Sequence, residues 1–221
     1  LGVAERTTMD LDTTVVNIPM EEAKIEKIIK KILQIDVGDG ITFEFNRIEP
    51  IREDDDYNNF RVHFIAMYGK IANPMKVDIT TGDEITPGAI HYSYKTILDG
   101  EELLVRAYNR ETIIAEKYET DIRRNIGTTR ARDFYDLYKF FNLYKNSLDY
   151  SILKSALMRT SGKRGSQSII MEWKEVLTDM KEDTSLHFLW ENYCINNLYA
   201  TGISYEDVMS VITEIGEMAN L

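Results

Sequence analysis

The spacing of apolar residues changes its period near residue 108, and this change constrains the fold more than any other feature of the sequence. Upstream, apolar and polar residues alternate in short runs, for example at 41–48 and 60–68. Such alternation is typical of β-strands that bury one face. Downstream, apolar residues recur every three to four positions, as in amphipathic helices. The sequence therefore predicts a strand-rich part, residues 1–108, and a helical part, residues 109–221.

The strand-rich part also contains one predicted helix, near residues 21–33. Ile25, Ile29 and Leu33 fall on one face of this segment. Two acids lead the segment and two lysines lie near its end, as the helix dipole prefers. Strands are expected at 11–16, 41–48, 60–68, 75–80, 91–98 and 103–107. Helices are expected at 111–125, 130–145, 149–160, 167–181, 185–197 and 204–219. A run of strands followed by a run of helices predicts an α+β fold.

Overall charge and cysteine content exclude several classes of protein. The 221 residues include 26 basic and 37 acidic ones, a net charge of −11, which argues against a protein that coats nucleic acid by bulk electrostatics. The single cysteine, Cys194, excludes a disulfide framework and a cysteine-based zinc site. The sequence contains no membrane-length apolar run and no signal-peptide pattern. We therefore expect a soluble protein of the reduced cytoplasm.

Two aspartates begin the first predicted strand. Asp10 and Asp12 lie two residues apart, so a strand places both carboxylates on one face and directs Leu11 to the other side. Mg²⁺ or Mn²⁺, which prefer oxygen ligands, would relieve the repulsion between the two carboxylates. The pattern is short, however, and by itself it favours a solvent-facing strand edge over a metal site.

A third acid lies in the middle of an apolar strand. Asp78 and Lys76 point to one face of this strand, while the apolar residues between and beyond them point to the other. A carboxylate in such surroundings needs a partner. Two alternatives remain open: an ion pair with Lys76, or a metal ion shared with Asp10 and Asp12.

The segment 121–145 is locally basic in an otherwise acidic chain. Its basic residues are Arg123, Arg124, Arg130, Arg132, Lys139 and Lys145, and its acids are Asp121, Asp133 and Asp136. A surface that binds phosphate would have this composition. An ordinary charged helix face would have it too, and charge alone favours that explanation.

Taken in order, four sequence blocks resemble the AbiEii/AbiGii toxin family of nucleotidyltransferases, within the DNA polymerase β-like superfamily. The blocks are Arg6-x-Thr8-x-Asp10-Leu11-Asp12, Lys76-Val77-Asp78-Ile79, Glu111-Thr112-Ile113-Ile114-Ala115-Glu116-Lys117 and Arg132-Asp133-Phe134-Tyr135-Asp136-Leu137. The resemblance implies a nucleotidyltransferase-like mixed β-sheet with flanking helices in residues 1–108. It also implies that the helical C-terminal domain, residues 109–221, contributes to the active-site cleft.

One family feature does not occur in residues 1–221. Members carry a Gly-Gly-Ser or Gly-Gly-Thr turn shortly upstream of the Asp-x-Asp pattern, where it holds nucleotide phosphates. The part formed by residues 1–108 is therefore expected to lack this N-terminal glycine-turn segment.

The resemblance implies a role for individual residues. Asp10, Asp12 and Asp78 would hold Mg²⁺ or Mn²⁺, and Asp78 would also help to activate the attacking hydroxyl. Lys117 would project towards the triphosphate, and Asp136 matches the acid of the family's Asp-Leu motif. These five would be the catalytic residues. Substrate-binding roles would fall to Arg6, Lys76, Arg132 and Asp133, although Arg6 would serve equally well in a structural ion pair with Asp10.

The reaction implied by the resemblance is metal-dependent transfer of a nucleotide from a nucleoside triphosphate to an acceptor hydroxyl. The implied acceptor is tRNA, and the implied biological role is that of the toxin in a toxin–antitoxin or abortive-infection system, with a cognate antitoxin as partner and no membrane association. Two alternatives remain. The acceptor could be a protein or small-molecule hydroxyl, or the protein could be a non-catalytic regulator that retains the fold, an alternative supported by the missing glycine turn.

Overall fold

The computed structural model describes residues 11–51, 58–96 and 100–221. Residue contacts divide the chain into two compact units, with the division between Asp83 and Glu84. The sequence alone predicts a boundary near residue 108. The residues between these two positions include a two-stranded antiparallel sheet, which groups with the helical unit.

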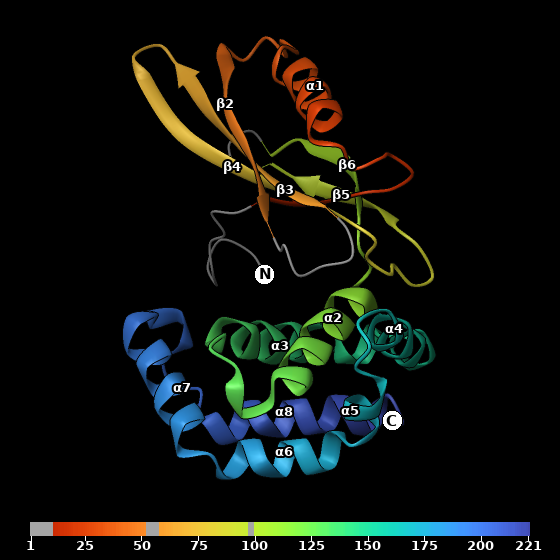
Figure 1. Ribbon diagram of the computed structural model, residues 1–221. Coiled ribbons are helices and arrows are strands. Elements are labelled where there is room, and N and C mark those ends of the chain that lie inside the picture. The colour runs from red at the N-terminus through yellow and green to blue at the C-terminus, as the bar shows by residue number, and fades with distance from the viewer. Residues whose placement is uncertain (1–10, 52–57, 97–99) are drawn as a thin grey trace. The chain divides into compact units, whose positions relative to one another are not determined.

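The unit that precedes Glu84 is built on a four-stranded sheet (Figure 1). The strand order is β1 (Leu11–Val15), β4 (Ile71–Thr81), β3 (Asn59–Tyr68) and β2 (Ile41–Ile51). β1 pairs with β4 in parallel, whereas β4 with β3 and β3 with β2 are antiparallel. The predicted mixed sheet is therefore confirmed.

Helix α1 (Glu22–Leu33) covers one face of this sheet. Its apolar stripe, which includes the buried Ile25, packs against side chains from every strand. The buried strand residues are Phe60, Val62, Phe64, Val77 and Ile79. Polar residues alternate with them along β3 and β4, so the opposite face of the sheet carries the charged side chains.

A bulge in β2 decides which of its residues reach the charged face. The register with β3 shifts between Phe45 and Arg47, where Asn46 is the extra residue. Phe45 pairs with an apolar residue of β3 before the shift, and Ile48 does so after it. The shift therefore leaves Arg47 and Glu49 on the charged face.

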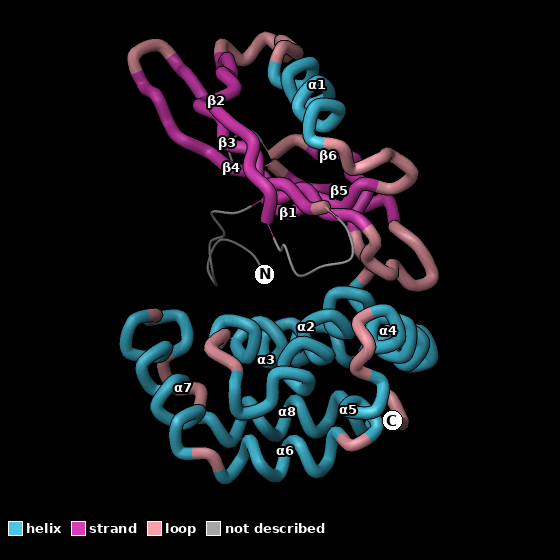
Figure 2. Tube along the Cα trace, in the orientation of Figure 1, coloured by secondary structure: helices cyan, strands magenta, loops and turns pink. Residues whose placement is uncertain are grey.

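The unit that begins at Glu84 is mainly helical (Figure 2). Its elements are β5 (Ile90–Lys95), β6 (Glu102–Ala107), α2 (Arg110–Arg124), α3 (Ala131–Tyr144), α4 (Tyr150–Lys163), α5 (Gln167–Met171), α6 (Trp173–Glu182), α7 (Thr184–Asn196) and α8 (Tyr205–Met218). Large aromatic side chains dominate its core. Tyr118, Phe134, Tyr135 and Phe141 are completely buried there. Across the described residues, none of the helices combines the length and hydrophobicity that crossing a bilayer requires.

One segment predicted as a single helix forms two helices in the structure. Residues 167–181 were expected to form a single helix, but the structure breaks it at Glu172, between α5 and α6. Ile170 and Trp173 on either side of the break are both buried. The helical spacing of apolar residues therefore continues across the break, and the pattern gives no sign of it.

Glycine at position 216 is required by the packing of α8. A Cβ atom there would lie 2.6 Å from the Tyr118 hydroxyl and 2.8 Å from the Trp173 ring. Both side chains are buried and have little room to move. We expect Gly216→Ala to lower the unfolding free energy by about 1–3 kcal/mol, measured by urea denaturation. The matched change Gly127→Ala, where the described structure has open space, should leave the unfolding free energy unchanged. Equal stabilities of the two variants would contradict the packing argument.

Candidate functional site

The charged face of the sheet brings two of the predicted carboxylates side by side. Asp12 and Asp78 are register partners on the parallel strands β1 and β4, and partners in register project from the same face. The Asp12 side chain is exposed, and Asp78 is almost buried. Asp10 and Arg6, also predicted from sequence, lie outside the described residues.

Asp78 has an arginine partner from the neighbouring strand rather than the suggested Lys76. The Arg61 Nε donates to Asp78 Oδ1 at 2.7 Å, and Nη2 donates to Oδ2 at 2.8 Å. This is the bidentate geometry in which arginine binds carboxylates most strongly. Arg61 was missed by the sequence analysis. The alternation of Phe60, Val62 and Phe64 places Arg61 on the charged face, but only the register between strands places it beside Asp78.

Hydrogen bonds from threonine hydroxyl groups link the short strand β1 to β4 and to Asp83, next to Asp12 and Asp78. Thr14 and Thr80 donate to the same carboxylate oxygen of Asp83, at 3.0 and 3.1 Å, and the two hydroxyl oxygens lie 3.1 Å apart. Thr13 donates to the Asp78 carbonyl at 3.0 Å. These bonds fix the pairing that sets Asp12 opposite Asp78.

The donor chemistry of this face suits a divalent cation only in part. No group of three or more metal-ligating side chains occurs among the residues described here, and Asp10 is not one of them. Asp12 offers an exposed carboxylate, the type of ligand that Mg²⁺ and Mn²⁺ prefer. Asp78 also offers carboxylate oxygens, but both already accept hydrogen bonds from Arg61. A cation at Asp78 would have to share them.

In the helical unit, three further predicted residues come together between α2 and α3. The Lys117 Nζ donates to Asp133 Oδ1 and to Asp136 Oδ2, each at 2.9 Å. Asp133 and Asp136 lie three positions apart, which places them on one face of α3. The Asp133 carboxylate also pairs with Arg130 Nε. The lysine is therefore held as a cation between two nearly buried carboxylates.

The charges of this cluster follow from competition between burial and pairing. Burial by itself would lower the pKa of Lys117, but the carboxylates of Asp136 and Asp133 outweigh it and raise that pKa. Burial would likewise raise the pKa of Asp133, but the Lys117 ammonium group outweighs it and lowers that pKa. The lysine stays protonated and Asp133 stays ionised at neutral pH.

One turn after Lys117, α2 carries an acid that the sequence analysis did not single out. Asp121 is completely buried, and neither of its carboxyl oxygens has a hydrogen-bond partner in the described part of the chain. Burial, and then repulsion from Asp133, raises the pKa of Asp121 well above its usual range. Burial therefore disfavours the ionised form of Asp121 in the folded chain.

The raised pKa of Asp121 should make stability fall as pH rises. Its pKa is higher in the folded than in the unfolded chain, so its contribution is complete below the unfolded pKa and declines above it. We expect Asp121→Asn, which is neutral at every pH, to raise the unfolding free energy at pH 7 by at least about 1 kcal/mol. Urea denaturation at pH 3 to 8 tests this. The gain should vanish near pH 3, and a less stable variant at pH 7 would refute the argument. Asp179→Asn, at an exposed position of α6, is the control.

Most of the basic residues in segment 121–145 have structural partners. Arg123 pairs with the buried Glu119, Arg130 with Asp133 and Lys145 with Glu214, while Lys139 lies over the Tyr135 ring. For Arg124 and Arg132, no ion pair is found within the part of the chain that the structure describes, and both are exposed. The charged helix face thus accounts for most of the segment, which leaves Arg124 and Arg132 as its candidate phosphate contacts.

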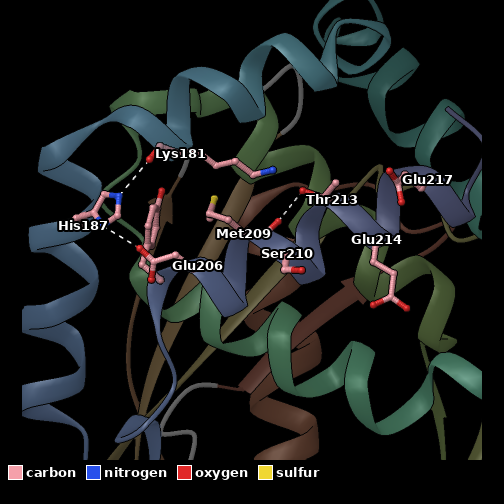
Figure 3. Close-up of a pocket in the computed structure, with 9 residues that line it drawn as sticks. Lys181, His187, Glu206, Met209, Ser210, Thr213, Glu214 and Glu217 are labelled. Atoms are coloured by element: carbon pink, nitrogen blue, oxygen red, sulfur yellow. Dashed lines mark hydrogen bonds and ion pairs between the residues drawn. The ribbon is translucent and has the colours of Figure 1, made fainter.

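Two shallow pockets lie in the helical unit. The first, formed by α6, α7 and α8, contains none of the predicted site residues (Figure 3). It is lined by Lys181, His187, Tyr205, Glu206, Met209, Ser210, Thr213, Glu214 and Glu217. The second contains Arg130 and Arg132 at the start of α3, together with asparagines of α7 such as Asn192 and Asn196. Of these two pockets, the second includes a predicted substrate-binding residue, Arg132.

Comparison with known proteins identifies one family. The sequence profile of a family described as nucleotidyl transferase AbiEii toxin, type IV toxin–antitoxin system, matches residues 1–201. The chain is similar to a candidate nucleotidyltransferase from Helicobacter pylori, with 19% identity, a TM-score of 0.42, and coverage of 99% of this chain and 79% of that one. It is also similar to JHP933 from Helicobacter pylori, with 19% identity, a TM-score of 0.43, and coverage of 99% and 76%. No curated protein matches.

Proposed function

The chain belongs to the nucleotidyl transferase AbiEii toxin family of type IV toxin–antitoxin systems, and we propose that it moves a nucleotide from a nucleoside triphosphate to an acceptor hydroxyl with the help of Mg²⁺ or Mn²⁺. Family membership supports the enzyme class and the toxin role, and it implies an antitoxin partner. The metal dependence, the acceptor and the individual site residues belong to the proposal. The observation that carries it is the placement of Asp12 beside Asp78 on one face of the sheet.

In the proposed reaction, the acceptor hydroxyl oxygen attacks the α-phosphorus of the nucleotide. The bond from that phosphorus to the bridging oxygen breaks, and pyrophosphate leaves. Asp10 and Asp12, with Asp78, are the residues that would hold the cations. Bound cations would neutralise the charge that develops on the phosphates. Asp78 would in addition orient the attacking hydroxyl and accept its proton.

Lys117 would bind the triphosphate. Its ammonium group is a compact point charge that suits phosphate oxygens. Ion pairs with Asp133 and Asp136 support this role, because they hold the lysine protonated and in one place. Such preorganisation reduces the cost of ordering a long side chain when the substrate arrives. Lys76 and Arg6 would supply further contacts to the substrate.

The proposed acceptor is tRNA. The exposed Arg132, in a pocket at the start of α3, supports an anionic acceptor or nucleotide. A basic contact of this kind is local, because the chain as a whole carries a net charge of −11. Strong steering of RNA by the overall field is therefore not part of the proposal.

Incubation of the full-length protein with each of four labelled nucleoside triphosphates, Mg²⁺ and total tRNA tests the proposal. We expect label on the RNA from at least one nucleotide, lost on addition of a chelator. Label on a protein or a small molecule instead would show that the acceptor is not tRNA. Absence of label from every acceptor, together with undiminished toxicity of Asp12→Asn in cells, would identify a non-catalytic protein.

A further inference from the structure

Three charged residues form a row across the neighbouring strands β1, β4 and β3. Asp12 is the register partner of Asp78, and Asp78 is the register partner of Arg61. Asp78 therefore lies between a second carboxylate on one side and a guanidinium group on the other. Its own side chain is 12% exposed, and that of Arg61 is 32% exposed, so solvent screens the pair only in part.

The guanidinium group engages the whole carboxylate. Nε and Nη2 of Arg61 reach Oδ1 and Oδ2 of Asp78 at 2.7 and 2.8 Å. A divalent cation placed between Asp12 and Asp78 needs the same oxygens, and it would carry two positive charges close to the fixed charge of Arg61. A cation there would therefore compete with the arginine for one carboxylate.

The next acid along the row, Glu49, has hydrogen-bond partners on β2 and β3. Glu49 is the register partner of Arg61 on β2. Its Oε1 lies 2.9 Å from His63 Nε2, and its Oε2 lies 3.2 Å from Arg47 Nε. Both oxygens of Glu49 thus have partners other than Arg61.

We propose that Arg61 is a positioning residue that holds Asp78 in the cation-free protein and competes with Mg²⁺ or Mn²⁺ for its carboxylate. The inference rests on the proposed metal-dependent function. It assigns to Arg61 the role of a built-in counter-ion, which keeps two neighbouring carboxylates from repelling each other until a cation replaces it at Asp78.

Binding of Mn²⁺ alone tests the proposal without reference to activity. Electron paramagnetic resonance of free Mn²⁺ gives the affinity of the full-length protein and of each variant. Arg61→Gln removes the competing charge and both donors to Asp78, so Mn²⁺ should bind at least about tenfold more tightly. Arg61→Lys keeps the charge but cannot make the bidentate contact, so a smaller increase in Mn²⁺ affinity is expected. Arg47→Gln removes a charge from the same face at β2, where Glu49 and His63 are its partners, and should leave the affinity unchanged.

The outcomes separate this proposal from the proposed function. Asp12→Asn should weaken Mn²⁺ binding whether or not Arg61 competes. If it does so while folded Arg61→Gln binds Mn²⁺ as tightly as the native protein, or more weakly, competition is refuted and the metal site survives. If the native protein and every variant bind no Mn²⁺, both proposals fail. Should Arg61→Gln not fold, Arg61→Lys decides the matter, because native affinity in that folded variant would also refute competition.

Discussion

Replacing Asp12 by asparagine should reduce nucleotide transfer by about 100- to 1,000-fold while leaving the fold intact. The change removes one negative charge from the proposed cation site, and electrostatic contacts of this kind typically contribute that much to the rate. The side chain is exposed on β1, and a surface substitution usually alters the unfolding free energy by less than about 0.5 kcal/mol. Loss of activity therefore should not come from unfolding.

Single-turnover transfer with labelled nucleotide, together with urea denaturation of the same preparation, measures both effects. Asp179→Asn makes the same change in charge at an exposed position of α6, and it should transfer nucleotide at the native rate. If Asp12→Asn kept at least half of the native rate, the assignment of Asp12 to the cation site would be wrong.

Lys117→Met should lower both stability and activity, because the lysine balances two nearly buried carboxylates. The side chains of Asp133 and Asp136 are 2% and 6% exposed, and that of Lys117 is 27% exposed. Removal of one partner from a buried cluster leaves uncompensated charge. We expect a loss of about 2–4 kcal/mol in unfolding free energy at pH 7. Arg130 still pairs with Asp133 in the variant, which limits the loss.

A conservative replacement separates the two roles of Lys117. Lys117→Arg keeps the positive charge, so most of the stability should return. A planar guanidinium group does not replace a point charge at the triphosphate, so transfer should remain at least about tenfold slower. Lys31→Met, at an exposed position of α1, is the control for removal of a lysine. If Lys117→Met were as stable as the native protein, the cluster would contribute nothing to the fold, and native transfer by Lys117→Arg would exclude a specific role for the ammonium group.

The sequence predicts local structure well because local patterns determine it. The apolar stripe of residues 21–33 corresponds to α1, and the alternation at 60–68 corresponds to β3. Helix spacing alone places Asp133 and Asp136 on one face of α3. That Lys117 lies opposite them depends on how α2 packs against α3, which no local pattern specifies. The resemblance to a family, and not the spacing, singled out this lysine.

The partner of Asp78 could not be predicted for the same physical reason. Lys76 is its neighbour on one face of the same strand, so it is the candidate that sequence offers. Arg61 becomes the partner through the register of β3 with β4, which depends on the turn between them and on the packing of the opposite face. The bulge at Asn46 is a further example, because a single extra residue changes which side chains of β2 face the site.

The parallel pairing of β1 with β4 also determines when the carboxylates meet during synthesis. Among the described strands of this sheet, β1 is the first to leave the ribosome and β4 is the last. The register partner of Asp12 on β4 is made only after β2 and β3, and contacts so distant along the chain form late. A nascent chain therefore cannot bring this pair of acids together before β4 has been made.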